Sequence, residues 1–119
     1  MTEYERKKML SMTLTKDAKT ILFTLYKEYE KRKKSGTSKS KAKNFDSAKS
    51  IQENFFPKML LEDVEDSLRE LGRNGFLDNH YADNTVYFCS LSDSAIATME
   101  SQTKETLLNI ADFISKFIP

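Results

Sequence analysis

The chain has 119 residues, of which 39% are hydrophobic and 31% charged, and its formal net charge at pH 7 is +1. This length and balance indicate one domain with a single core, spanning residues 1–119. No apolar run approaches the roughly 20 residues that cross a bilayer, and the first eight residues are mostly polar, so we expect neither a membrane span nor a secretion signal. Cys89 is the only cysteine and cannot form an internal disulfide, which is typical of a cytoplasmic protein.

The small net charge hides an uneven distribution. Residues 1–49 hold 14 Lys/Arg and 6 Asp/Glu, a net of +8, whereas residues 50–119 hold 5 and 12, a net of −7. One interpretation is a basic side that faces a polyanion. The other is that the two halves attract each other within the fold.

The first predicted helix follows a polar lead-in over residues 1–13. Thr15 is the expected N-cap, and the helix should end before Gly36. Its inward face repeats at helical spacing and comprises Ala18, Ile21, Leu22, Leu25 and Tyr29.

Residues 35–44 show no apolar periodicity and are predicted to form a basic flexible loop. A very short strand is expected at 44–46. Ser47 then caps a second helix with Ala48, Ile51 and Phe55 facing the core, and Pro57 ends it.

The third predicted helix spans residues 60–74, and Gly75 ends it because glycine adopts the left-handed conformation at no steric cost. Its expected buried stripe is Leu61, Val64, Leu68 and Leu71. Two strands rich in aromatic and β-branched residues follow at 76–81 and 85–91, joined by a turn at 82–84.

A last helix is expected to start at Ser92 or Asp93 and to continue as a C-terminal helical extension over residues 101–119. Its apolar face either packs on the first helix or contributes to a homodimer, and we favour some contribution to dimerisation. The dimerisation residues would be Leu107, Ile110, Ile114 and Phe117. The order of helix, short strand, helix, helix, two-stranded wing and long C-terminal helix predicts an α+β winged helix-turn-helix.

Several of these segments resemble a known family. The third helix with Gly75-Phe76-Leu77, the two strands, and the run Leu91-Ser92-Asp93 through Ile96 to Met99-Glu100 are similar to small winged-helix proteins of the YjcQ type, from Gram-positive bacteria and their phages. The resemblance covers about residues 14–117 and lies mostly in core and turn positions. It implies a DNA-binding-like scaffold and a regulatory or phage-related role.

The third helix would be the DNA-reading helix, although it carries five acidic and two basic residues between positions 61 and 74, a net of −3. An arginine there can grip a guanine edge with two hydrogen bonds. The alternative, which we favour, is that Arg69 and Arg73 pair with Glu62, Glu65 or Glu70 on a solvated face. The candidate base-reading residues are Ser67, Arg69, Arg73 and Asn74.

Two further segments are candidates for contact with the DNA backbone. The run from residue 31 to 43 carries seven positive charges and no negative one, which suits contact with phosphates without sequence readout. The alternative is a solvated helix end. The candidate phosphate-binding residues are Lys31, Arg32, Lys33, Lys34, Lys39, Lys41 and Lys43. In the wing, Asn79, His80 and Asn84 are candidate hydrogen-bond donors, against the alternative of ordinary turn chemistry.

No catalytic constellation is visible in the sequence. His80 is the only histidine and the chain holds three glycines, so neither an ordinary zinc site nor a glycine-rich phosphate loop is expected. We therefore expect no enzyme activity, metal or cofactor. The leading hypothesis is a small transcriptional regulator of bacterial or phage origin that binds double-stranded DNA. The alternative is a protein–protein interaction module that uses its acidic third helix.

Overall fold

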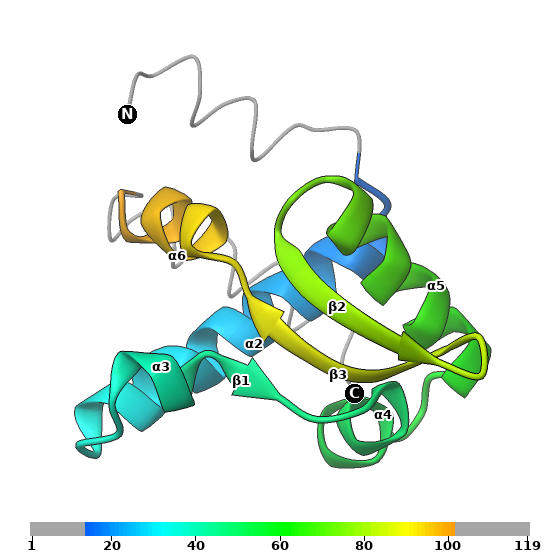
Figure 1. Cartoon of the computed structure of the whole chain (residues 1–119), viewed down its shortest axis with the longest axis horizontal. Helices are drawn as coiled ribbons and strands as arrows, with labels where there is room; N and C mark the ends of the chain where they lie inside the picture. Colours follow the sequence, from blue (N-terminus) through cyan, green and yellow to red (C-terminus); the bar gives the residue numbers. More distant parts are fainter. Residues whose placement is uncertain (1–13, 102–119) are drawn as a thin grey trace.

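The computed structural model describes residues 14–101, and this part of the chain forms a mixed α+β fold (Figure 1). Its elements in chain order are α2 (Lys16–Lys34), α3 (Lys39–Ala42), β1 (Asn44–Phe45), α4 (Ala48–Phe55), α5 (Leu61–Arg73), β2 (Leu77–Ala82), β3 (Thr85–Leu91) and α6 (Asp93–Glu100). This is the predicted order with one short helix added. The polar lead-in and the C-terminal extension, with the predicted dimerisation residues Leu107, Ile110, Ile114 and Phe117, lie outside the described residues.

Three helices start where the sequence predicts a side-chain cap. The Thr15 hydroxyl accepts a hydrogen bond from the Ala18 backbone N–H at 3.2 Å, and Ser47 and Ser92 cap α4 and α6 in the same way. Such a cap satisfies a backbone donor that has no partner inside the helix. Gly75 follows α5 with a φ of 79°, a conformation that residues with a Cβ rarely adopt.

The strands form one antiparallel sheet in the order β1-β3-β2. β2 and β3 make a hairpin, in which Leu77 lies opposite Leu91 and Ala82 opposite Thr85. The turn contains two residues, Asp83 and Asn84, both with positive φ, as a tight turn between twisted strands requires. The sequence places β2 one residue too early and makes the turn one residue too long, because Ala82 carries no turn or strand signal of its own.

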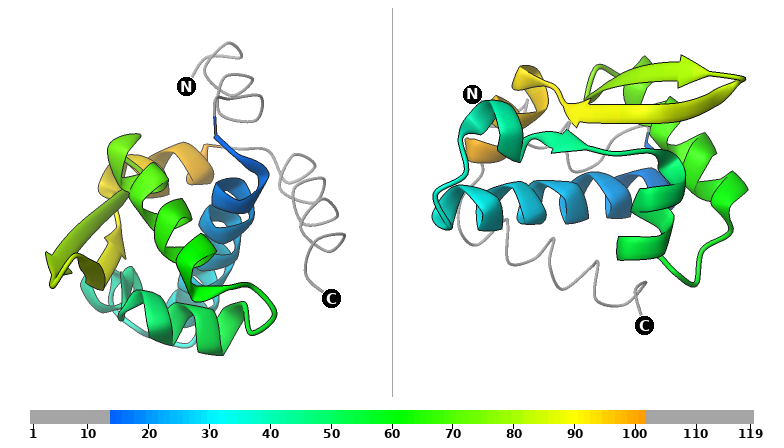
Figure 2. Two further views of the ribbon diagram at one scale, coloured as in Figure 1. Left: turned by 90° about the vertical axis from the view of Figure 1, so that its right-hand side faces the viewer. Right: turned by 60° about the horizontal axis from the view of Figure 1, so that its bottom comes forward.

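The core lies where α2 and α5 pack against each other under the sheet (Figure 2). Of the predicted apolar stripes, all five residues of α2 are buried, as are Val64, Leu68 and Leu71 of α5. Leu61 was predicted to be buried and is 42% exposed. Its helical phase matches the stripe, but it is the first residue of α5 and extends past the elements against which the helix packs.

The segment 35–44 is not a loop throughout, because Lys39–Ala42 form the four-residue helix α3. A single turn is too short to show an apolar period, so the sequence pattern could not reveal it. Its one buried side chain is Ala42. Arg32 of α2 donates to the carbonyls of Ala42 and Asn44 at 3.3 and 2.7 Å, which fastens this segment to the first helix. None of the helices between residues 14 and 101 is long and apolar enough to cross a membrane.

Candidate nucleic-acid interface

Arg69, a predicted base-reading residue, is held by contacts within the molecule. Its guanidinium lies 3.6 Å from the Glu65 carboxylate, donates to the backbone carbonyl of Asn84 and lies 5.3 Å from the centre of the Tyr81 ring. Glu65 also accepts a hydrogen bond from the Val86 backbone N–H at 3.2 Å. The favoured ion pair is confirmed for Arg69, and the side chain fastens α5 to the hairpin.

Two other predicted contact residues face inward. Ser67 is only 4% exposed, because it lies three residues after Val64 on the buried side of α5. Asn79 is half-buried, and its side-chain N–H donates to the Leu68 carbonyl at 2.8 Å. Side chains alternate along a strand, and Asn79 shares with Leu77 the side that faces α5. The predictions of Ser67 as a base-reading residue and of Asn79 as an exposed wing donor are therefore wrong.

The C-terminal end of α5 holds the remaining candidates. Arg73 is exposed and makes no ion pair among residues 14–101, so the pairing favoured from the sequence is wrong for this residue. Its expected partner Glu70 binds Thr15 instead, accepting from the backbone N–H at 2.7 Å and from the hydroxyl at 2.8 Å. The Asn74 side chain donates to the Glu70 carbonyl at 2.8 Å and closes the helix end. One exposed arginine is left on this helix.

The N-terminal end of α5 presents leucines and carboxylates. Leu60 is 70% exposed and Leu61 42%, and the carboxylates of Glu62, Asp63 and Asp66 are exposed beside them. A winged helix that reads DNA usually brings the N-terminal residues of this helix to the base edges. Carboxylates and leucines at that position raise the cost of approaching a phosphate backbone.

The sequence analysis did not identify the two leucines as surface residues. It assigned Leu61 to the buried stripe, because Leu61 is in helical phase with Val64, and gave Leu60 only as the start of the helix. Only the tertiary packing shows that the core ends one turn later.

The other face of the hairpin carries a group of aromatic rings. His80 lies 5.7 Å from the Phe88 ring and 6.2 Å from the Tyr87 ring, measured between centroids. His80 and Tyr87 are exposed, and Asn84 occupies the turn. His80 and Asn84 are exposed, and the positive φ of Asn84 fits the alternative of ordinary turn chemistry. No basic side chain accompanies them on β2 or β3.

The seven basic residues between positions 31 and 43 fall into three groups according to their contacts. Arg32 lies 3.3 Å from Glu28, holds the two carbonyls around β1 and stacks 4.5 Å from the centre of the Phe45 ring, so it is structural and the phosphate-binding prediction is wrong for it. Lys39 and Lys43 lie 3.8 and 3.4 Å from the Asp93 carboxylate. These contacts join the basic and acidic halves of the chain, as the second interpretation of the charge asymmetry requires. The exposed lysines without an ion pair among residues 14–101 are Lys31, Lys33, Lys34 and Lys41.

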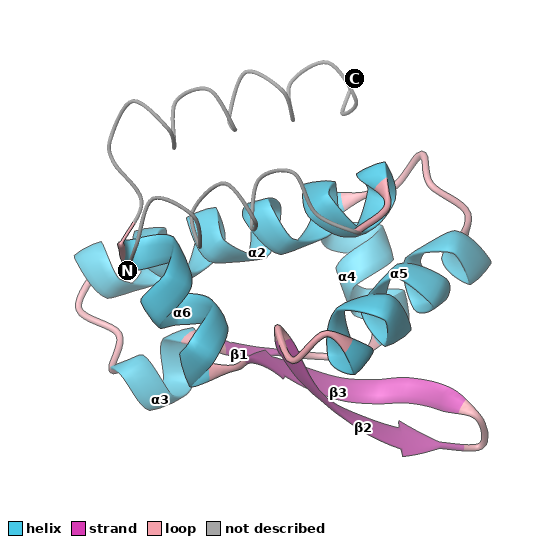
Figure 3. Cartoon of the chain, turned by 90° about the horizontal axis from the view of Figure 1, so that it is seen from above, coloured by secondary structure: helices cyan, strands magenta, loops and turns pink. Residues whose placement is uncertain are grey.

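We call Lys31, Lys33, Lys34, Lys39, Lys41 and Lys43 the lysine end. It surrounds the end of α2 and the short helix α3, whereas the start of α5 and the hairpin turn lie at the opposite end of the molecule (Figures 1 and 3). The residues predicted to bind phosphates and those predicted to read bases are therefore not on one surface. Of the two arginines of α5, Arg69 is engaged with Glu65 and the hairpin, and Arg73 makes no ion pair among residues 14–101.

Other chemistry is limited in the described part of the chain. Residues 14–101 contain no group of three or more His, Cys, Asp or Glu that could hold a metal ion. Cys89 is fully buried, and burial, with a smaller effect of Asp46, raises the pKa of its thiol to about 12. The thiol therefore stays protonated at neutral pH and is a poor nucleophile.

Comparison with protein-family models, with curated proteins and with solved structures gave no match. The resemblance to YjcQ-type proteins stays a prediction.

Proposed function

We propose that this chain is a winged-helix protein-interaction module whose partner binds at the start of α5. The element order and the antiparallel sheet support the winged-helix assignment, with the β2–β3 hairpin as the wing. We name the interaction site the α5 docking surface and define it as Leu60, Leu61, Glu62, Asp63 and Asp66.

The observation that carries the proposal is the pair of exposed leucines next to three exposed carboxylates. Adjacent large apolar side chains beside a charged rim are typical of the centre of a protein interface, where a few buried anchors supply most of the affinity. Burying one leucine is worth about 1.5–3 kcal/mol. The carboxylates favour a partner with lysines or arginines around an apolar patch, because complementary charges steer the encounter and fix the orientation.

The same surface disfavours the major groove of DNA. Affinity for DNA depends mainly on cations that neutralise phosphates, and the only cation that α5 offers freely is Arg73, at the far end of the helix. Arg69 would have to give up its contacts with Glu65, Tyr81 and the Asn84 carbonyl before it reached a base.

Site-specific crosslinking in the organism that carries the gene tests this proposal. A photoreactive residue in place of Glu62 should give one protein adduct. The same photoreactive residue in place of Glu53, which is exposed on α4, is the control and should give none. The adduct should disappear in the double variant Leu60→Ser, Leu61→Ser, in which the carboxylates remain. An adduct with nucleic acid at Glu62, or a protein adduct that survives the double variant, would overturn the proposal.

A second candidate function is contact with a nucleic-acid backbone through the lysine end. The specific observation is six lysines around α2 and α3, four of them without an ion pair among the described residues. Such contacts bind phosphates without reading sequence, and the affinity falls steeply as salt is raised. The charge reversals Lys39→Glu and Lys41→Glu should then weaken binding of a random duplex and flatten its salt dependence; unchanged affinity would reject this function.

A further inference from the structure

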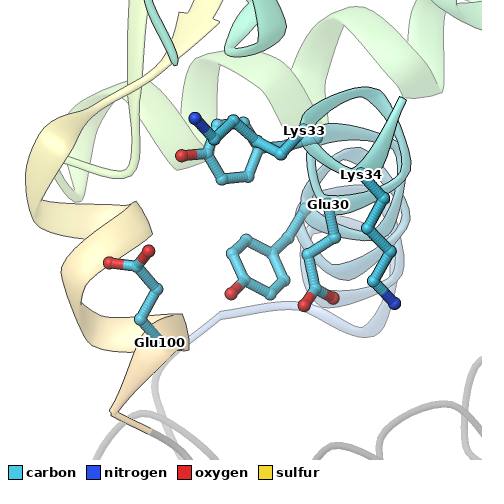
Figure 4. Close-up of a pocket in the computed structure, with 6 residues that line it drawn as sticks. Glu30, Lys33, Lys34 and Glu100 are labelled. Carbon is cyan, nitrogen blue, oxygen red and sulfur yellow. The ribbon is translucent and has the colours of Figure 1, made fainter. Parts of the chain in front are cut away.

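A hollow of about 350 Å³ lies between the second half of α2 and the end of α6 (Figure 4). Its walls hold two carboxylates, of Glu30 and Glu100, and two lysines, Lys33 and Lys34, so they favour neither a cation nor an anion. The hollow therefore defines no class of ligand. A chemically reactive pair of residues lies elsewhere, at the end of α5.

The junction between α5 and the hairpin contains Asn74-Gly75, the only asparagine of the chain that is followed by glycine. Asparagine is chemically labile, because the backbone nitrogen of the next residue can attack its side-chain amide carbon. Glycine hinders this attack least, since it has no Cβ. Both residues are exposed, and a Cβ placed on Gly75 would meet no heavy atom within 4 Å beyond its chain neighbours. The surroundings therefore leave room for ring closure and for water.

Two hydrogen bonds fix the reacting groups in the folded helix end. The Asn74 side-chain nitrogen donates to the Glu70 carbonyl at 2.8 Å, and the Gly75 N–H donates to the Gly72 carbonyl at 3.1 Å. The ψ of Asn74 is 5°, and closing a ring through the Gly75 nitrogen requires rotation about this bond. Both hydrogen bonds belong to the last turn of α5, and helix ends open more readily than helix centres. The reaction therefore depends on opening of this turn.

We propose that Asn74 is a deamidation site, at which the side-chain amide is converted to aspartate and isoaspartate when the last turn of α5 opens. The Gly75 nitrogen gives its proton to the solvent and forms a bond to Asn74 Cγ. The Cγ–Nδ2 bond breaks, and Nδ2 takes up a proton and leaves as ammonia, which produces a succinimide ring. Water then adds to a ring carbonyl and breaks its bond to the Gly75 nitrogen, which regains a proton. Opening at Cγ gives aspartate, and opening at the main-chain carbonyl gives isoaspartate.

Isoaspartate at this position disturbs three elements. It lengthens the main chain just before Gly75, whose carbonyl accepts a hydrogen bond from the Ser92 hydroxyl at 2.7 Å. The next residue, Phe76, donates to the Leu71 carbonyl at 2.9 Å, and its own carbonyl accepts from the Ser92 N–H at 3.1 Å. These bonds join the end of α5 to the start of β2 and to the N-cap of α6. The new carboxylate also lies at a helix C-terminus, where negative charge is unfavourable. The modification should therefore loosen this junction.

Peptide mapping of the full folded chain after prolonged incubation at neutral pH tests the proposal. Asn74 should convert to a mixture of isoaspartate and aspartate, and incubation in heavy-oxygen water should label both products. Asn84, which is also exposed but is followed by threonine, is the internal control and should remain unchanged over the same period. No conversion at Asn74, equal conversion at Asn84, or aspartate without isoaspartate overturns the proposal.

Two variants test the roles of Gly75 and of helix opening. Gly75→Asn should abolish the isoaspartate signal at position 74, because asparagine tolerates the φ of 79° while its Cβ hinders the attack. Glu70→Ala releases the end of α5 from Thr15 and should speed conversion about threefold to tenfold, the effect of a lost hydrogen bond on an opening equilibrium. Glu53→Ala is the matched control and should leave the rate unchanged. An unchanged rate in Gly75→Asn or in Glu70→Ala contradicts the proposed route.

Hydrogen exchange tests the structural consequence. The isolated isoaspartate form should exchange the amide hydrogens of Phe76 and Ser92 faster than the unmodified chain does. The Ile51 amide, which donates to the Ser47 carbonyl at the start of α4, is the control and should not change. Asn74→Asp carries the charge without the longer main chain and should show a smaller effect. Unchanged exchange at Phe76 and Ser92 would show that the junction tolerates the modification, against the proposal.

Discussion

Gly72 of α5 and Asn79 of β2 fit together so closely that a Cβ on Gly72 would lie 2.5 Å from the Asn79 side-chain nitrogen. That nitrogen donates to the Leu68 carbonyl, one turn earlier on the same helix. The glycine therefore opens a gap in the helix surface through which a side chain of the hairpin reaches the helix backbone. Together with Glu65 and Arg69, this contact fixes α5 and the hairpin as one unit.

Gly72→Ala is expected to destabilise the protein. Alanine in place of glycine inside a helix normally stabilises by about 0.5–1 kcal/mol, but here the methyl group would displace the Asn79 amide and break its hydrogen bond. We expect a net loss of about 1–3 kcal/mol in the free energy of unfolding, measured by urea denaturation. The control is the double variant with Asn79→Ala, in which the methyl group has room. If the loss of stability in the double variant equals the sum of the losses in Gly72→Ala and Asn79→Ala alone, the close fit between these residues is not the cause of the destabilisation.

The two arginines of α5 are expected to respond differently to truncation. Arg69→Ala removes contacts to Glu65, Tyr81 and the Asn84 carbonyl, and should cost about 1–2 kcal/mol. Arg73→Ala should change the free energy of unfolding by less than about 0.5 kcal/mol. Hydrogen exchange at the Val86 amide reports the hairpin directly and should be faster in Arg69→Ala alone. Equal stabilities would show that Arg69 does not fasten the hairpin.

The Glu70 carboxylate links the end of α5 to the start of α2 through its two hydrogen bonds to Thr15. Glu70→Ala should lower the free energy of unfolding by about 1–2 kcal/mol, because a charge-assisted bond to a capping residue is lost. Glu53→Ala, an exposed carboxylate on α4, is the matched control and should be nearly neutral. A similar small effect for both would mean that the link to Thr15 contributes little.

The Cys89 thiol is expected to resist alkylation at pH 8 in the folded protein and to react when the chain unfolds. Its pKa rises from an ordinary 9.0 to about 12, mainly through burial. Below about pH 9 the thiol is mostly protonated in both the folded and the unfolded state, so it adds little pH dependence to the free energy of unfolding. Between about pH 9 and 12 the unfolded thiol loses its proton first, so stability should fall by about 1.4 kcal/mol per pH unit relative to Cys89→Ala. Parallel stability curves for the two proteins above pH 9 would contradict the burial argument.

The elements themselves could be predicted from local signals. Thr15, Ser47 and Ser92 each mark a helix start, and Gly75 marks a helix end, because capping depends on a few neighbouring residues. The apolar stripe of α5 was right from Val64 onward. Helix α3 could not be predicted, since one turn anchored by a single alanine leaves no period to detect.

The candidate site was harder to predict, because exposure depends on contacts between distant segments. Leu61 has the phase of a core residue and lies beyond the core, while Ser67 has the chemistry of a surface residue and lies inside it. Spacing identifies Glu65 as a partner for Arg69 but cannot show that the hairpin turn completes the contact. The separation of the lysine end from the start of α5 depends on the direction in which α2 packs across α5, which the sequence pattern does not specify.

The central claim is that α5 is a protein-docking helix and not a DNA-reading one. The most direct test is an NMR titration of the full chain with DNA duplexes of random sequence and with duplexes of several defined sequences. The titration is done at about 50 mM salt, where cationic contacts are strong. We predict that any amide shifts are confined to residues 31–43 and that residues 61–73 do not respond. Saturable shifts along α5 that depend on base sequence and disappear in Arg73→Ala would contradict the account and restore the DNA-reading function.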